Sequence, residues 1–190
     1  EQVRNNSDFK CSSDLLEPEE GNGNDKENGS GQGNDEEGPK VGADLLAYSQ
    51  PQCDYTVTEG ESINSVIAGV GDGSVVCVED GTFNGDVTVN KEITLAGAGA
   101  VTSSVINGQV RIQTSNVTLQ GFRILNGVRV ESGDYPDNVT ISHNHIENTT
   151  AGFGILFNGD GSASGSTIDN NIVNVGSDDS AISLRHGQYG

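Results

Sequence analysis

The sequence repeats one short phrase at a spacing of 22 residues. It reads NVTLQGFRI from Asn116 and NVTISHNHI from Asn138. The related phrases ITLAG and STIDN extend the series, with steps of 24, 22 and 27 residues between Leu95, Leu119, Ile141 and Ile168. A period of roughly 20–30 residues is typical of a solenoid, in which each repeat buries its apolar face against the next one.

Two further apolar series keep the same order within every repeat. The second series contains Ile106, Ile124, Ile146 and Ile172, and the third lies near Val89, Ile112, Val130, Leu156 and Leu184. Three strand positions per repeat predict an all-β chain folded as a parallel β-helix, with coils stacked about 4.8 Å apart. The unequal steps predict loops of different lengths on one side, with ESGDYPD and NGDGSASG as insertions.

A short amphipathic segment precedes the repeats. In ESINSVIAGV, Ile63, Val66, Ile67 and Val70 follow the i, i+3, i+4, i+7 spacing of one helix face, which predicts a helix over 61–70. This helix would cap the N-terminal end of the coil and hide its edge. The chain has no Trp or Met and 5% aromatic residues, so we expect a core of small branched side chains with tight Gly and Asn turns.

Residues 1–50 have a different composition from the rest of the chain. They carry twelve acidic and four basic residues in a low-complexity Gly/Asn/Glu sequence, with too few apolar groups to offset the entropy of ordering. We therefore expect an extended acidic linker or tail over 1–50 and the β-helix domain over 51–190. An EF-hand-like spacing in the tail is poor because it places Lys26 at a ligand position.

The net charge of −19 restricts the partners. No basic patch exists to neutralise the phosphates of nucleic acid or an anionic membrane surface, and no run of 18 apolar residues would insert into a bilayer. The acidic residues indicate either a strongly hydrated surface suited to high salt or carboxylate sites for divalent cations. The first interpretation is favoured because the charges are spread along the chain, and we expect no cofactor, with Ca²⁺ left open.

The cysteines and sequons indicate an extracellular protein. Cys53 precedes the first strand-like run and Cys77 lies in SVVCVED, so the two form either a disulfide or a pair of buried thiols. The disulfide is favoured, which leaves Cys11 free or paired with another chain. The chain begins at Glu1, so a secretory signal would already have been removed. N-x-S/T sequons mark candidate glycosylation sites at Asn5, Asn28, Asn116, Asn138 and Asn148.

The stretch from YTVTEGESINSVI through GTFNGDVTVNKEITLAGAG to NVTISHNHIEN resembles a known family. Residues 53–190 look like a right-handed parallel β-helix of the pectin-lyase-like superfamily. More narrowly, they resemble the NosD-type, carbohydrate-binding-and-sugar-hydrolysis repeats of bacterial and archaeal surface proteins. The acidic bias is similar to that of secreted proteins from salt-loving archaea. The resemblance implies fold more than function, because such repeats mainly encode the coil.

Asparagines recur near the second apolar series. Three of them, Asn126, Asn148 and Asn174, each stand two positions after a member of that series. Two more, Asn144 and Asn170, each stand two positions before one. Stacked asparagines can hydrogen-bond along the coil axis and to turn backbones, so we predict a structural asparagine ladder. A laddered Asn148 would not be available to a glycan.

Candidate reactive groups are few. Asp178, Asp179, Arg185 and His186 in GSDDSAISLRH echo the acid/base site of polygalacturonase-like hydrolases. However, Thr150 stands where that family has a third carboxylate, and paired aspartates before a strand are ordinary turn residues.

Metal-binding candidates are equally weak. His143, His145 and Glu147 could hold a metal only if a neighbouring turn supplied a further ligand, and none is evident. The GDG turns at Asp72 and Asp160 are interpreted as tight turns. We therefore assign no catalytic or metal residue, and an enzyme is disfavoured.

These observations favour a non-catalytic extracellular module, a structural or adhesive component of a cell-surface or filamentous assembly. The alternatives are a carbohydrate-binding module and a polysaccharide lyase or hydrolase. The sequence given ends at SLRHGQYG, just after a strand, so either the native chain continues beyond residue 190 or another subunit covers this end of the coil. We expect self-association, or contact with another surface protein, through this open C-terminal end and the acidic tail. Carbohydrate remains a further candidate partner.

Overall fold

The computed structural model describes residues 49–98, 103–131, 136–148, 152–159 and 163–186, without the side chain of His186. Within these residues the chain forms one short helix and three parallel sheets. Residues 1–48 of the predicted acidic tail, with Cys11 and the sequons at Asn5 and Asn28, lie outside them, as do Thr150 and Asp160.

Each complete coil contributes one strand to each sheet, and β1 adds a sixth strand to the first sheet. The first sheet contains β1 (Tyr55–Val57), β2 (Val75–Val78), β5 (Thr94–Gly97), β8 (Thr118–Gln120), β11 (Thr140–Ser142) and β14 (Thr167–Asp169). The second contains β3 (Gly81–Asn84), β6 (Ser104–Asn107), β9 (Arg123–Ile124), β12 (His145–Asn148) and β15 (Ile172–Val175). The third contains β4 (Val87–Val89), β7 (Val110–Ile112), β10 (Val128–Glu131), β13 (Phe153–Gly159) and β16 (Ser180–His186).

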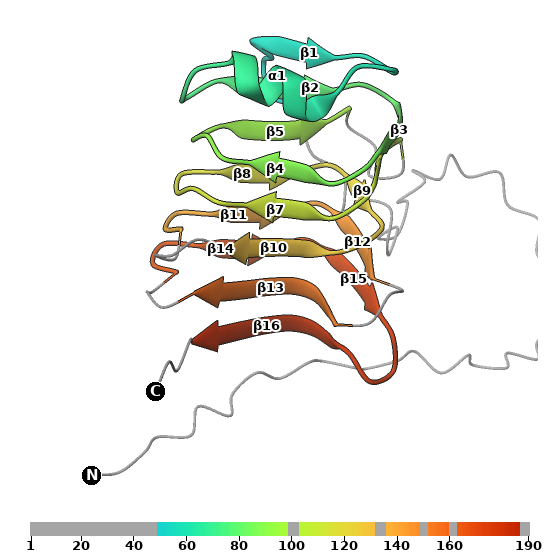
Figure 1. The fold of residues 1–190 in the computed structure, drawn as a ribbon, viewed down its shortest axis with the longest axis vertical. Coiled ribbons are helices and arrows are strands. Elements are labelled where there is room, and N and C mark those ends of the chain that lie inside the picture. The colour runs from blue at the N-terminus through green and yellow to red at the C-terminus, as the bar shows by residue number, and fades with distance from the viewer. Residues whose placement is uncertain (1–48, 99–102, 132–135, 149–151, 160–162, 187–190) are drawn as a thin grey trace, which may run out of the picture. The chain divides into compact units, whose positions relative to one another are not determined.

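The strands wind into a parallel β-helix of about five turns, as the sequence predicts. In Figure 1 the third sheet lies at the front with its strands running to the left, and the first sheet lies behind it with its strands running to the right. The chain descends as it winds, so the coil is right-handed, the hand expected of parallel crossover connections.

The core is a stack of like side chains. Leu95, Leu119, Ile141 and Ile168 occupy one register position on successive strands of the first sheet, and the first three are fully buried. In the second sheet Ile106, Ile124 and Ile146 do the same. A single coil leaves the upper and lower sides of its inward-facing side chains exposed. The coils above and below it bury these sides.

Two members of the predicted series were placed one residue wrong. Ile146 pairs with Val173 rather than Ile172, whose side chain is 36% exposed. Val130 pairs with Phe157 rather than Leu156. In both segments two apolar residues are adjacent, so the pattern fits either register. A slip of one residue turns every side chain of a strand to the other face.

The capping helix α1 spans Ile63–Gly69, inside the predicted range. The Ser62 hydroxyl accepts a hydrogen bond from the Ser65 N–H, which satisfies one of the unpaired donors of the first turn. Ile63, Ile67 and Val70 are buried, so the predicted apolar face points into the coil. At the other end of the helix, the Lys91 ammonium donates to the carbonyl oxygens of Ala68 and Val70.

Candidate functional site

Asn144 is the central residue of an asparagine ladder inside the coil. It is fully buried, and its Nδ2 donates to the Leu119, Ser142 and Asn171 oxygens at 2.8–3.0 Å. Its Oδ1 accepts from the Phe122 N–H at 3.0 Å. Asn171 repeats part of this pattern one coil further on, with Nδ2 donating to the Ile141 and Asp169 carbonyls. The ladder therefore satisfies the backbone of a turn that leaves the first sheet.

The prediction for Asn170 was wrong, because Asn171 takes its place beside Asn144. Asn170 adopts a left-handed conformation with φ 50°, and its side chain donates to Asp169 outside the ladder. Asparagine tolerates this conformation better than most residues. The error has the same origin as the slip at Ile172, since the ladder was counted from that residue.

The three asparagines predicted after the second apolar series, Asn126, Asn148 and Asn174, do not form one stack. Asn126 and Asn148 lie opposite each other across an isolated bridge, and Asn148 Nδ2 donates to the Phe153 carbonyl at 2.8 Å. Asn174 is in register with Glu147 instead, and its Nδ2 lies 3.0 Å from His145 Nε2. Asn174 therefore belongs to the outer face of the coil and does not stack on Asn148.

The sequons differ in exposure. Asn116 and Asn138 occupy equivalent exposed turns on consecutive coils, both left-handed, with φ 58° and 54°. Asn138 Nδ2 donates to Asn116 Oδ1 at 3.1 Å, and Asn116 Nδ2 donates to Glu92 at 3.0 Å. Each amide nitrogen keeps a second hydrogen outside this contact. Asn148, by contrast, is only 6% exposed. Glycosylation stays a prediction, and the geometry favours Asn116 and Asn138 over Asn148.

Charged side chains on the outer faces pair between neighbouring coils. Arg123 Nε lies 3.0 Å from Glu147 Oε1, and His145 Nε2 lies 3.4 Å from the same oxygen. The candidate metal ligands His145 and Glu147 are thus engaged with an arginine and with Asn174. His143 lies in the left-handed turn before β12, with φ 55°. Among the described residues no group of three or more His, Cys, Asp or Glu side chains could hold a metal ion.

The acid pair of the polygalacturonase-like pattern lies in the turn between β15 and β16. Asp179 Oδ1 accepts a hydrogen bond from the Gly152 N–H at 2.6 Å, and Asp178 is exposed. The Arg185 guanidinium lies over the Phe153 ring at 4.2 Å. Asp179 therefore joins two successive turns, and Arg185 covers an aromatic ring. Asp72 has a similar turn role, since its Oδ1 accepts from the Glu92 N–H at 3.1 Å.

A polar groove of about 260 Å³ follows the turns between the second and third sheets. Its lining residues are Asp86, Gln109, Arg111, Asn126, Arg129, Asn148, Gly152 and Phe153. Arg111 and Arg129 stand side by side on β7 and β10, and Glu131 lies 2.9 Å from the first and 3.5 Å from the second. Asp86 Oδ2 also lies 4.0 Å from Arg111 Nε, so two carboxylates of the same chain, Glu131 and Asp86, stand beside the two guanidinium groups.

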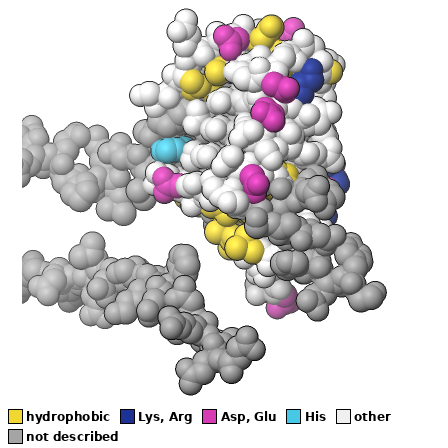
Figure 2. All heavy atoms as spheres, turned by 90° about the vertical axis from the view of Figure 1, so that its left-hand side faces the viewer, with side chains coloured by type: hydrophobic (Ala, Val, Ile, Leu, Met, Phe, Trp, Pro, Cys, Tyr) yellow, Lys and Arg dark blue, Asp and Glu magenta, His cyan; other side chains and the backbone are white. Residues whose placement is uncertain are grey.

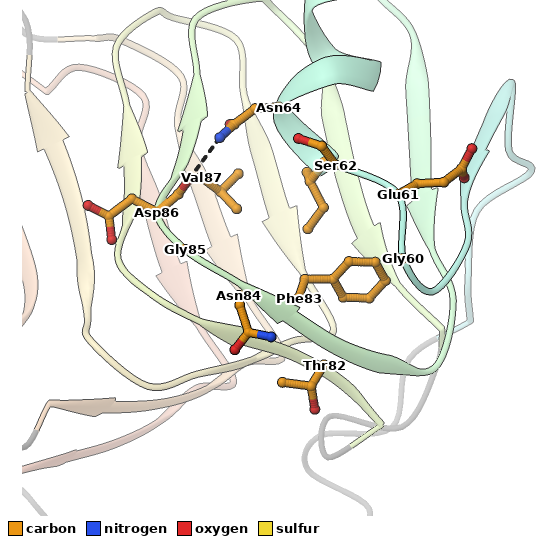
Figure 3. A pocket seen from close by; sticks show the side chains of 11 residues that line it. Gly60, Glu61, Ser62, Asn64, Thr82, Phe83, Asn84, Gly85, Asp86 and Val87 are labelled. Atoms are coloured by element: carbon orange, nitrogen blue, oxygen red, sulfur yellow. Dashed lines mark hydrogen bonds between the residues drawn. The ribbon is translucent and has the colours of Figure 1, made fainter.

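A second cavity of about 320 Å³ lies beside the capping helix (Figure 3). It is lined by Gly60–Asn64 on one side and Thr82–Val87 on the other. Glu61, at its rim, accepts hydrogen bonds from the backbone N–H and hydroxyl of Thr58, which lower the pKa of the carboxyl. Glu61 is therefore ionised at neutral pH. This cavity was not predicted from the sequence, which gives no pattern that marks the space between a cap and a strand edge.

The predicted disulfide between Cys53 and Cys77 is present, with the two Cα atoms 5.7 Å apart. It ties the segment before β1 to β2. Disulfides persist in oxidising compartments, which is consistent with an extracellular location. No helix among the described residues is long and apolar enough to cross a membrane.

The chain also resembles a protein of known name. The chain is similar to a cell surface glycoprotein of the archaeon Methanothermus fervidus, with 31% identity over 83 residues. The match covers 40% of this chain and 14% of the length of that protein. No family model matches the chain, and no solved structure matches it. The β-helix fold and this relative are both compatible with a non-catalytic module of a cell surface.

Proposed function

We propose that this chain is a non-catalytic, extracellular β-helix module with a structural or adhesive role in a cell-surface or filamentous assembly. One observation carries the proposal. The charged side chains of the outer faces pair with one another between coils, as Arg123 does with Glu147 and Arg111 with Glu131. Groups paired in this way hold coils in register and are not poised for acid/base chemistry.

The surface supports the same conclusion. On the face shown in Figure 2 the acidic side chains are scattered among uncharged ones and form no single column. Sugar-binding platforms use exposed aromatic rings, yet Phe83, Phe122 and Phe157 are buried in the coil. The relative from Methanothermus is itself a cell surface glycoprotein, which supports the extracellular location. We also propose that the chain is a NosD-type module of the pectin-lyase-like superfamily from a salt-loving archaeon.

We further propose that contact with another subunit uses the C-terminal end of the described coil. Ile182 and Leu184 are 49% and 71% exposed, although their partners on β13, Ile155 and Phe157, are buried. Inward-facing side chains left without a covering layer favour association. The acidic tail would act as a tether or an inter-subunit strap.

Light scattering at low and high salt tests this assembly. The chain is expected to associate, and more strongly at high salt because the repulsion of its acidic groups is screened. A double variant, Ile182→Ser with Leu184→Ser, should associate less, whereas the matched control Tyr55→Ser at the opposite end should behave like the unchanged chain. A monomer under all conditions would contradict the assembly proposal.

Carbohydrate binding is a second candidate because of the groove beside Arg111 and Arg129. Its amides, guanidinium groups and the Phe153 ring are side chains that bind sugar hydroxyls and ring faces. Isothermal titration with neutral and uronic-acid oligosaccharides, on the unchanged chain and on Arg129→Ala, distinguishes this function. Heat of binding that Arg129→Ala abolishes would favour it over a purely structural role.

A further inference from the structure

Two neighbouring strand edges at the N-terminal end of the coil differ in how they are covered. The edge of β4 is covered by one side chain of α1. Asn64 Nδ2 donates to the Asp86 carbonyl at 2.8 Å, and Asn64 Oδ1 accepts from the Thr88 N–H at 2.9 Å (Figure 3). A residue of a parallel strand bonds in this way to two alternate residues of its neighbour. The Asn64 amide therefore takes the place of one residue of a missing strand.

The edge of β3 has no such cover among the described residues. β3 is the last strand of the second sheet and pairs only with β6. The N–H groups of Gly81 and Gly85 point toward β6 and donate to the carbonyls of Ser103 and Asn107. Alternate residues of a strand bond to opposite neighbours, so Thr82 and Asn84 direct their N–H and C=O groups away from β6. Within the described part of the chain these groups have no hydrogen-bond partner.

The 320 Å³ cavity lies along this open edge. Figure 3 shows the start of α1 on one side of it and β3 on the other, with the Phe83 ring between them. Ile63 and Val87 add apolar surface, and Thr82 and Asn84 are exposed. The volume falls at the lower limit of ligand sites, which hold roughly 300–1,000 Å³. The cavity thus combines unpaired backbone groups with a small apolar floor.

Carboxylates stand at the rim of this cavity. Glu61 and Asp86 are among its lining residues, and Figure 3 shows their side chains directed outward from it. Glu59 lies beside Gly81 at the start of β3, 3.4 Å from where a Cβ of Gly81 would be. Of these carboxylates, Asp86 has an arginine beside it, with Arg111 Nε 4.0 Å from Asp86 Oδ2. The local charge therefore favours a basic ligand. It disfavours the acidic segment 1–50 of this chain or of a second copy.

We propose that the edge of β3 binds an extended peptide of another protein as an added parallel strand. Two alternate residues, Thr82 and Asn84, present the hydrogen-bonding pattern that a strand matches, and strand addition to an open edge is a known mode of peptide recognition. The peptide places an apolar side chain against Phe83 and basic side chains beside Glu59 and Glu61. This surface lies at the end opposite to Ile182 and Leu184, so the inference goes beyond the proposed function and is independent of it.

The test uses the full chain and a synthetic peptide, KVTVK, with blocked ends. Titration followed by NMR is expected to shift the amide signals of Thr82 and Asn84 and to slow their hydrogen exchange. Thr82→Pro removes the N–H that faces the cavity and leaves the bonds to β6, so affinity should fall roughly tenfold, the effect of one unsatisfied buried hydrogen bond. The matched control Thr82→Val keeps the N–H and should bind like the unchanged chain.

Two further peptides keep the test decisive if Thr82→Pro does not fold. A copy of KVTVK with N-methylated amides cannot pair with a strand edge and should not bind the unchanged chain. EVTVE should bind more weakly than KVTVK because of the carboxylates at the rim. Absence of KVTVK binding, equal binding of the N-methylated peptide, or equal binding of EVTVE would each overturn the proposal. None of these results depends on whether the chain self-associates.

Discussion

The two ends of the described coil present the same kind of side chain in very different surroundings. At the N-terminal end Ile63 and Ile67 of α1, and Val70 directly after it, are buried. At the C-terminal end Ile182 and Leu184 occupy the register positions of Ile155 and Phe157, yet they are exposed. An inward-facing side chain in this fold is therefore buried only when another coil or the capping helix lies over it.

The difference extends to hydrogen bonding. Near α1 the Asn64 amide makes hydrogen bonds to β4 that a neighbouring strand would otherwise make. The Cys53–Cys77 disulfide joins the segment before β1 to β2. Among the described residues of β16 no comparable cover is found on the side away from β13. Stability should therefore decrease from the capped end and the middle of the coil toward the open end.

The largest expected effect comes from truncating the middle of the core. Leu119 is fully buried between Leu95 and Ile141, so Leu119→Ala should lower the free energy of unfolding by about 2–5 kcal/mol. Leu184→Ala, the same change at the open end, should cost less than about 1 kcal/mol because the side chain is already exposed. Urea unfolding of both variants checks the comparison, and equal losses would contradict it.

The disulfide has the next largest effect. Cys53 and Cys77 are 24 residues apart, and closing a loop of this size stabilises a fold by about 3 kcal/mol. Replacing both cysteines by Ala should lower the midpoint of urea unfolding accordingly. Reductant should then have no additional effect on the double variant, whereas it should destabilise the unchanged chain. A midpoint unaffected by the double substitution would show that the capped end needs no covalent tie.

The buried ladder comes third. Asn144→Ala leaves the Phe122 N–H and the Leu119 carbonyl without their partner, at a cost of about 1–3 kcal/mol. The matched control is Asn170→Ala, since Asn170 lies in the neighbouring turn and its side chain donates a hydrogen bond to Asp169 outside the ladder. Thermal unfolding should separate the two variants clearly. Equal losses would mean that the left-handed turn, rather than the ladder, determines stability here.

The smallest effect is expected at the strand edge covered by α1. Asn64→Ala removes two exposed hydrogen bonds to β4 and should destabilise the chain by about 1 kcal/mol. Hydrogen exchange of the Thr88 amide gives a local measurement and should become faster in this variant. Asn64→Asp is the informative comparison, because it can still accept from Thr88 but cannot donate to Asp86. Unchanged exchange in Asn64→Ala would contradict the role assigned to this side chain.

Much of the fold could be predicted because the repeat fixes it. The series through Leu95, Leu119 and Ile141 identifies one strand per coil, and the spacing within ESINSVIAGV predicts α1 with its buried face. Where the pattern failed, two apolar residues stood together, as Ile172 and Val173 do. The step from Ile141 to Ile168 already indicated the register, since the same offset carries Ile146 to Val173 and Asn144 to Asn171.

The candidate sites were harder to predict, for a physical reason. Asn64 is one polar residue on a short helix, and only the position of α1 above β4 gives its amide a role. The open groups of Thr82 and Asn84 belong to the backbone, so no side-chain motif reports them. Glu131 and Glu147 could be recognised as charged strand residues, but their arginine partners lie 20 and 24 residues away. Such pairs become visible only once the coils are in register.

The direction of the hydrogen bonds has a mechanical consequence. In a coil of parallel strands these bonds run along the axis of the rod, from each turn to the next. A pull along this axis therefore loads the bonds between successive turns in series. Under such a load the coil is expected to lengthen turn by turn, because each turn is held to the next by its own set of hydrogen bonds.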